Sequence, residues 1–125
     1  MIKIRRLSEE PGTKESEEGS LGVNSIDVIL KREDIQAFSS RLLRISPGGH
    51  TAYHEHPREH YAIVIRGRCR VETKESTAEI REANVVTIPS GVPHRFFNPG
   101  NEGLALLVLN LFPVEPKQEQ GATIL

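Results

Sequence analysis

Short runs of apolar residues, four to nine residues long, recur along the chain between polar segments. Several runs alternate apolar and polar positions, which is the period of a strand with one buried face. No stretch of ten or more residues shows a convincing apolar repeat of 3.6 residues, so the pattern does not favour helices. We therefore predict strands at residues 26–30, 38–45, 61–65, 68–74, 77–81, 85–88, 94–98 and 104–112.

Glycine and proline mark the ends of these predicted strands. Pro47-Gly48-Gly49 is expected to close the second strand, and Pro99-Gly100 to stop the seventh. Arg66-Gly67-Arg68 separates two adjoining runs and is expected to form a hairpin turn. Many short strands with this punctuation are typical of an all-β sandwich or barrel.

The length of 125 residues indicates one domain, and no internal repeat is visible. We expect an N-terminal arm over residues 1–35, a barrel over residues 36–113 and a C-terminal tail over residues 114–125. Within the arm, residues 8–20 are polar and acidic, and we interpret them as a solvated loop. Leu, Ile, Val and Phe make up 35 of the 125 residues, which is enough for a folded core.

Composition excludes several classes of function. The net charge of −1 offers no excess of positive charge to hold a polyanion, so nucleic-acid binding is not expected. The longest apolar run, Leu104–Leu109, is far too short for a membrane helix, and the basic N-terminus is not followed by the apolar region of a signal peptide. Cys69 is the only cysteine, so an internal disulfide and a cysteine-cluster metal site are excluded. A cytoplasmic protein fits these features.

The five histidines are clustered between positions 50 and 94. His54 and His56 are two residues apart, so on a strand they would point to the same face. His60 begins a predicted strand, with Ala62 and Val64 on its face. His94 begins a later strand, with Phe96 on its face. If these faces line one barrel interior, four imidazoles meet there, and neutral imidazoles suit Zn, Cu, Fe and Ni, with Mn also possible.

The spacing of these residues resembles the two sequence motifs of the cupin superfamily. The first stretch contains Gly48, His54, His56, His60 and Gly67, and the second contains Ala83, Pro89, Gly91, His94 and Asn98. Two positions depart from the family pattern. His60 stands where the family usually has a glutamate, and Ala83 replaces a turn glycine, a change that matters only if φ is positive there.

The resemblance implies a single-domain jelly-roll β-barrel and a metal site formed by His54, His56, His60 and His94, with one Mn, Fe, Ni, Cu or Zn ion. Glu59 is adjacent to a ligand position and by alternation faces away from the metal. Phe96, Ala62 and Val64 are expected to line the pocket. Four neutral ligands leave the full +2 charge on the ion, which favours an anionic or deprotonated substrate. An ion with open positions can bind substrate or oxygen, whereas a closed tetrahedral zinc would be structural.

The predicted function is a metal-dependent oxidoreductase, of the dioxygenase type, that acts on a small molecule. Two alternatives remain open: a binding module that captures a small molecule without changing it, and a cupin isomerase. Fold alone does not choose among them.

Three further expectations concern partners and isolated residues. A homodimer is expected, formed by exchange of the N-terminal segment. Arg44 and Arg66 are strand cations that could anchor an anionic substrate, although solvated faces are the simpler interpretation. Cys69 is expected to be buried and inert.

Overall fold

The computed structural model describes residues 2–29, 38–53 and 55–111. Within these ranges the chain is almost entirely β-structure, with one short 3-10 helix. That helix, η1, has three residues, and no helix in the described ranges is long and apolar enough to cross a membrane. The elements are η1 (Leu7–Glu9), β1 (Thr13–Lys14), β2 (Leu21–Asp27), β3 (Phe38–His50), β4 (Glu59–Arg66), β5 (Arg68–Thr73), β6 (Thr77–Arg81), β7 (Val85–Ile88), β8 (His94–Phe97) and β9 (Leu104–Leu111).

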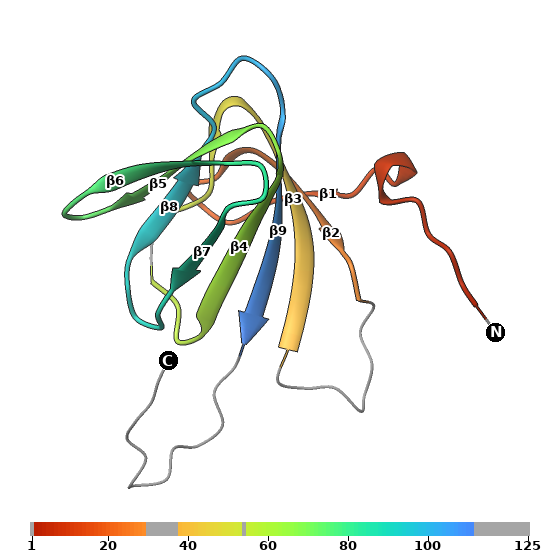
Figure 1. Cartoon of the computed structure of the whole chain (residues 1–125), viewed down its shortest axis with the longest axis horizontal. Helices are drawn as coiled ribbons and strands as arrows, with labels where there is room; N and C mark the ends of the chain where they lie inside the picture. The colour runs from red at the N-terminus through yellow and green to blue at the C-terminus, as the bar shows by residue number, and fades with distance from the viewer. Residues whose placement is uncertain (1, 30–37, 54, 112–125) are drawn as a thin grey trace, which may run out of the picture.

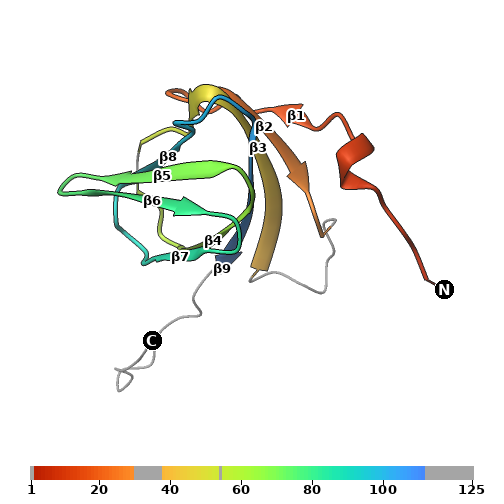
Figure 2. The ribbon, with the colours of Figure 1, turned by 45° about the horizontal axis from the view of Figure 1, so that its top comes forward.

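The strands form one antiparallel sheet that curls into a nearly closed barrel (Figures 1 and 2). Its order is β6-β5-β8-β3-β9-β4-β7; β2 pairs with β3 between Arg41 and His50, and β1 pairs with β2. The prediction of a single all-β barrel is confirmed. Neighbours in this order are far apart in sequence, so the barrel brings together residues that no local pattern connects.

The predicted strands at residues 77–81 and 85–88 match β6 and β7, and the prediction at residues 26–30 is misplaced. The first long strand is β2, whose Val23 and Ile26 are buried against the barrel. β3 also runs on to His50 instead of closing at Pro47. Gly49 permits this continuation, because a Cβ there would lie 2.5 Å from the Leu21 carbonyl oxygen.

The segment Arg66-Gly67-Arg68 is not a hairpin turn, which corrects the prediction from sequence. β4 pairs with β7 and β9, whereas β5 pairs with β6 and β8. The segment is therefore a corner at which the chain leaves one part of the sheet for another. Gly67 has a φ of 93°, and a Cβ there would lie 2.9 Å from the Gly103 carbonyl oxygen, so the corner requires glycine.

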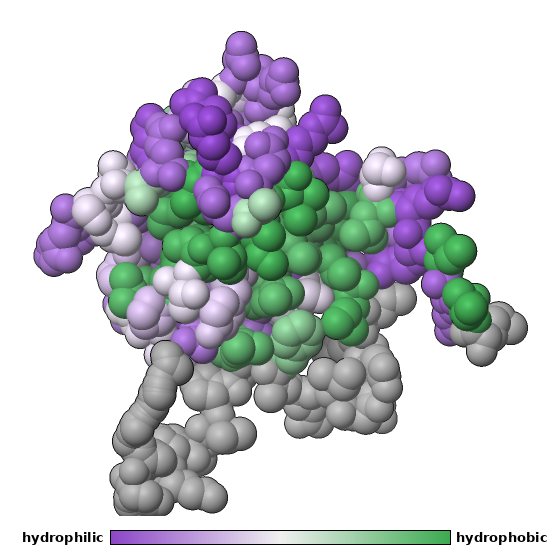
Figure 3. Space-filling model, viewed as in Figure 1, coloured by the Kyte–Doolittle hydropathy of each residue, from purple (hydrophilic) through white to green (hydrophobic). Residues whose placement is uncertain are grey.

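The barrel core is built by strict alternation along its central strands. In β9, Leu104, Leu106 and Val108 are buried and the residues between them are partly exposed. In β4, the buried positions are His60, Ala62 and Val64, so the predicted face of His60 is observed. The outer face is also apolar: Val85, Ile63, Leu107 and Leu42 are register partners across β7, β4, β9 and β3. Figure 3 shows a broad hydrophobic surface on the side where β4, β9 and β3 face the viewer.

Ala83 has a φ of 70° and is the one non-glycine residue with a positive φ in the described ranges. Its left-handed conformation costs an L residue about 1–2 kcal/mol, part of which a glycine would return as chain entropy in the unfolded state. We expect Ala83→Gly to stabilise the protein by about 1 kcal/mol, measured by chemical denaturation. Ala78→Gly, at an exposed position within β6, is the matched control and should destabilise it by about 0.5–1 kcal/mol. Equal losses in both variants would contradict the assignment of strain to Ala83.

Candidate functional site

A cavity of about 380 Å³ opens at one mouth of the barrel, and its volume suits a small molecule. Its walls come from β2, β3, β8 and β9, the start of β4, the loop between β3 and β4, and the segment that follows β1. The residues that line it are Glu15, Ser16, Glu17, Ser20, Val23, Arg41, Leu43, Thr51, Ala52, His56, Arg58, His60, His94, Phe96, Val108 and Asn110.

Three of the four predicted ligand histidines meet in this cavity. The ring centroids of His56 and His60 are 5.0 Å apart, those of His60 and His94 are 5.1 Å apart, and those of His56 and His94 are 5.9 Å apart. His94 begins β8 and His60 is the second residue of β4, so both lie at strand starts as predicted, but His56 lies in the loop between β3 and β4 and not on a strand. His54, the fourth predicted ligand, lies outside the described residues.

The imidazole of His60 is buried, and its ring nitrogens lack a binding partner in the described part of the chain. The side chain is 5% exposed, and neither Nδ1 nor Nε2 has a hydrogen-bond partner among the described residues. Burial, together with His94 and His56 beside it, lowers the pKa of His60 to about 3, so the ring is neutral at physiological pH. A neutral imidazole with an unpartnered buried nitrogen is the form that binds a metal ion.

His94 is oriented by the backbone. Its Nδ1 lies 2.8 Å from the Val92 carbonyl oxygen, which can only accept, so Nδ1 carries the hydrogen and Nε2 is the nitrogen with the lone pair. Histidines that bind metals usually donate their other ring N–H in this way. The described residues therefore supply suitable donors on both β4 and β8.

The spacing of the three ring centroids fits one ion. With nitrogen-to-metal distances of about 2.1 Å and angles of about 90–110°, ring centroids would be about 5 Å apart. Within the part of the chain that the structure describes, no three His, Cys, Asp or Glu side chains are already arranged to hold a metal ion. The imidazoles thus fit a metal site by residue type and ring spacing.

Charged side chains at the cavity were not foreseen from sequence. Arg41 Nη1 lies 3.6 Å from Glu15 Oε1, and Arg58 Nε donates to Asn110 Oδ1 over 3.2 Å. Burial and the nearby Arg41 lower the pKa of Arg58, and Glu17 acts in the opposite direction. The cavity thus combines cations and carboxylates beside the imidazoles.

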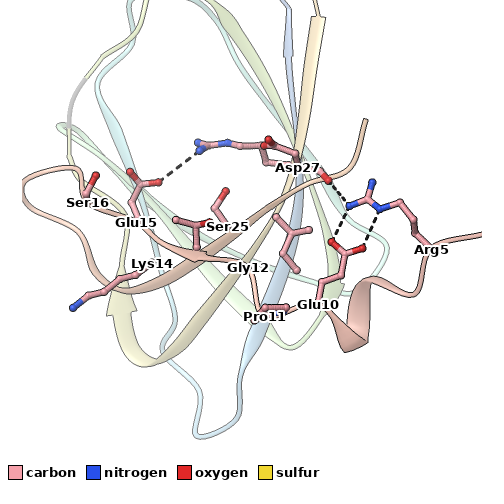
Figure 4. A pocket seen from close by; sticks show the side chains of 12 residues that line it. Arg5, Glu10, Pro11, Gly12, Lys14, Glu15, Ser16, Ser25 and Asp27 are labelled. Atoms are coloured by element: carbon pink, nitrogen blue, oxygen red, sulfur yellow. Dashed lines mark hydrogen bonds and ion pairs between the residues drawn. The ribbon is translucent and has the colours of Figure 1, made fainter. Parts of the chain in front are cut away.

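The carboxylates reach the cavity because the N-terminal arm is fastened to the barrel. Arg5 donates to both oxygens of Glu10, at 3.0 and 2.8 Å, and to the carbonyl oxygens of Asp27 and Val28 at the end of β2 (Figure 4). Lys14 of β1 pairs with Asn24 of β2, and the residues that follow Lys14, from Glu15 to Glu17, line the cavity. The segment interpreted as a solvated loop is therefore part of the site.

The other residues singled out from sequence have clear positions. Phe96 lines the cavity and its ring packs edge-on against His94, with centroids 5.4 Å apart. Ala62 and Val64 are in the barrel core and are not among the lining residues. Glu59 accepts a hydrogen bond from Tyr61 on the outer side of β4, at 3.4 Å. Cys69 is buried, and burial raises the pKa of its thiol to about 12.

Fold and site together define a single-domain β-barrel whose internal cavity is lined by histidines. Residues 41–110 match the cupin domain family, so the chain belongs to the cupins. Over 76 residues, 60% of its length, it is 36% identical to the polyketide synthase CurC of Streptomyces cyaneus. The match covers 49% of that protein, so the chain spans about half the length of this curated relative.

Solved structures show the same fold at lower identity. The polyketide cyclase RemF from Streptomyces resistomycificus has a TM-score of 0.79 and 23% identity, covering 90% of this chain and 81% of that one. A cupin-like protein from Thermotoga maritima has a TM-score of 0.75 and 24% identity, covering 82% of this chain and 79% of that one. At these identities the likeness shows the fold alone.

Proposed function

We propose that this cupin is a metal-dependent enzyme and that His54, His56, His60 and His94 hold one divalent Mn, Fe, Ni, Cu or Zn ion. The observation that carries the proposal is the meeting of His56, His60 and His94 at ring spacings of 5.0–5.9 Å. The unpartnered nitrogens of His60 support it, since a buried polar group without a partner costs about 1–3 kcal/mol. A bound ion would supply the partner.

We propose further that the substrate is a small poly-β-ketone and that the reaction closes a ring in it. Two likenesses support this class, since one relative is a polyketide synthase and one structural neighbour is a polyketide cyclase. The cavity supports it independently. Ring closure needs a base to remove a proton between two carbonyl groups, and Glu17 is a carboxylate at the cavity.

A bound divalent ion would polarise a carbonyl oxygen of the substrate and so acidify the methylene beside it. Glu17 takes a proton from that methylene, and the resulting carbon attacks a second carbonyl of the same molecule, forming the new C–C bond. Glu17 then returns the proton to the oxygen of the attacked carbonyl, and the resulting hydroxyl leaves as water with a proton from the neighbouring carbon, which forms a double bond in the closed ring. Arg41 and Arg58, both at the cavity, stabilise the negative charge that develops on oxygen.

A dioxygenase remains the second candidate function. The observation that favours it is the donor set: the described ligand candidates are all imidazoles, which suit the redox-active ions of Fe, Cu and Ni. Ring closure differs from it by its products, because it loses one water and consumes no oxygen. A single chain does not test the expected homodimer, which stays a prediction.

Replacing the proposed base should separate chemistry from metal binding. We expect Glu17→Gln to lower kcat for ring closure of a linear tetra-β-ketone by about 100-fold, because the amide cannot accept the proton. Metal content should stay unchanged, since Glu17 is not among the proposed ligands. Glu18→Gln is the matched control: Glu18 is exposed, does not line the cavity, and should keep kcat within about twofold.

The assay follows the product mass and oxygen uptake together, with protein reloaded separately with each of the five metals. Loss of one water without oxygen uptake is the expected result. Consumption of oxygen in proportion to substrate would overturn ring closure and support the dioxygenase activity. Saturable binding of the tetra-β-ketone with no product for any metal would overturn both and favour a binding module.

A further inference from the structure

Arg44 and Arg66, the two strand cations noted in the sequence, do not line the histidine cavity. They lie on the outer face of the barrel in one cross-strand row. Lys14 of β1 pairs with Asn24 of β2, which pairs with Arg44 of β3. Arg44 pairs with Ala105 of β9, which pairs with Arg66 of β4. The row thus crosses β1, β2, β3, β9 and β4, and every second strand of it, namely β1, β3 and β4, carries a cation.

The spacing of this row follows from sheet geometry. Neighbouring strands are ~4.8 Å apart, so the backbones of successive cations are about 10 Å apart and the row spans about 19 Å. Lys and Arg side chains are long enough for neighbours in such a row to reach one shared anion. Directly paired residues point to the same face, so the cations share one side of the sheet.

A groove of about 590 Å³ runs along this row. Lys14, Arg44 and Arg66 line it, and no Asp or Glu is among its lining residues in the described ranges. Between the cations, Gly22, Gly103 and Ala105 leave the space open. Figure 3 shows hydrophilic surface along the upper end of the strands, above the hydrophobic face. The groove thus concentrates positive charge in a chain whose net charge is −1.

The two carboxylates on which Arg44 and Arg66 act electrostatically have other partners. Glu10 is held by Arg5 through two hydrogen bonds, and Arg44 acts on it only as a nearby charge. Glu82 accepts a hydrogen bond from the Gly67 N–H, and Arg66 contributes a smaller part to the lowering of its pKa. Neither carboxylate lies in the groove, so an anion there would meet cations on three strands.

Arg44 offers a specific sign that an acceptor is missing. Its Nη2 donates to the Glu10 carbonyl oxygen at 2.6 Å, which fixes the guanidinium in place. Its Nε is buried and has no hydrogen-bond partner among the described residues. Buried donors are nearly always paired, so this N–H remains to be satisfied beside the cationic groove.

We propose that this groove binds a phosphate-bearing small molecule. Phosphate oxygens match the fork of N–H groups on a guanidinium, and two linked phosphates would match neighbouring cations of the row. The site is separate from the histidine cavity, because His60 begins β4 and Arg66 ends it, about 20 Å further along the strand. Binding is therefore independent of the metal and of the proposed reaction.

The test is a calorimetric titration of the full chain with inorganic phosphate, pyrophosphate and citrate at about 50 mM ionic strength. We expect saturable binding of pyrophosphate, tighter than that of phosphate or citrate. The variant Lys14→Gln/Arg66→Gln should bind pyrophosphate at least 10-fold more weakly, since both side chains are exposed and their loss leaves the fold intact. Arg44 is left unchanged because it also holds the arm.

The matched control is Arg68→Gln/Arg81→Gln, which removes the same charge from two exposed positions outside the groove. Its affinity for pyrophosphate should stay within twofold of the unaltered chain, so that general attraction of anions is separated from the groove. An equal loss in both double variants would overturn the site. Equal affinity for citrate and pyrophosphate, or no saturation by 10 mM, would overturn the phosphate-bearing ligand.

Discussion

Replacing His60 with leucine is expected to abolish metal binding while raising the stability of the metal-free protein. His60 is 5% exposed and both of its ring nitrogens lack partners in the described part of the chain, so without metal they are buried at a cost of about 1–3 kcal/mol. Leucine is of similar size and leaves no polar group unpaired. We expect a gain of about 1–2 kcal/mol for the chelator-treated variant and a loss of metal affinity of at least 100-fold.

Thermal melts in chelator and in excess metal measure both effects, the gain in stability and the loss of metal binding. In chelator, His60→Leu should unfold at a higher temperature than the unaltered chain. With metal at 100 times its Kd, the unaltered chain gains about 2.7 kcal/mol and the order reverses. His50→Leu is the control, since His50 bonds to the Thr51 carbonyl and does not line the cavity. Metal content that stays at one ion per chain in His60→Leu would remove His60 from the ligand set.

Asn98→Ala is expected to produce the largest loss of stability among single substitutions of polar residues. The side chain is 1% exposed, donates to the carbonyl oxygens of Ile45 and Glu102 at 2.9 and 2.8 Å, and accepts from the Gly100 N–H at 2.9 Å. Alanine would leave three backbone groups without these bonds. At about 1 kcal/mol each, the expected loss is about 3–4 kcal/mol, a large share of the total stability of a typical domain.

Chemical denaturation measures this loss, and Asn101→Ala is the matched control. Asn101 lies in the same loop but is exposed, so its removal should change the free energy of unfolding by less than about 0.5 kcal/mol. Similar effects of the two variants would mean that the loop, and not the three bonds of Asn98, determines stability here. Asn98 closes the second cupin motif, and these bonds give a structural reason for asparagine at that position.

The inward orientation of His60 and His94 could be predicted because alternation along a strand is local, whereas their meeting with His56 rested on the resemblance to the cupin motifs. His60 and His94 each begin a strand, and strict alternation along β4 and β8 places both inside the barrel. The position of His56 was less predictable, because the loop after β3 does not follow the period of a strand. The match of its ring to the other two comes from how that loop closes the barrel mouth.

The carboxylates of the site could not be predicted, because their positions depend on long-range pairing. Glu17 is 41 residues from Arg58, and nothing in the acidic run around it distinguishes it from a solvated loop. It reaches the cavity through the ladder from β1 to β2 to β3. The corner at Gly67 was misread for a similar reason, since a glycine between two strands does not reveal which strands pair.

The buried thiol of Cys69 gives the chain a built-in reporter of its own opening. The sulfur lies at a fully buried position in β5, between β6 and β8, and burial raises its pKa to about 12. Alkylating reagents need the thiolate, so they should modify the sulfur only when this part of the barrel separates. The rate of alkylation in native buffer therefore measures how often the barrel opens, with no introduced label.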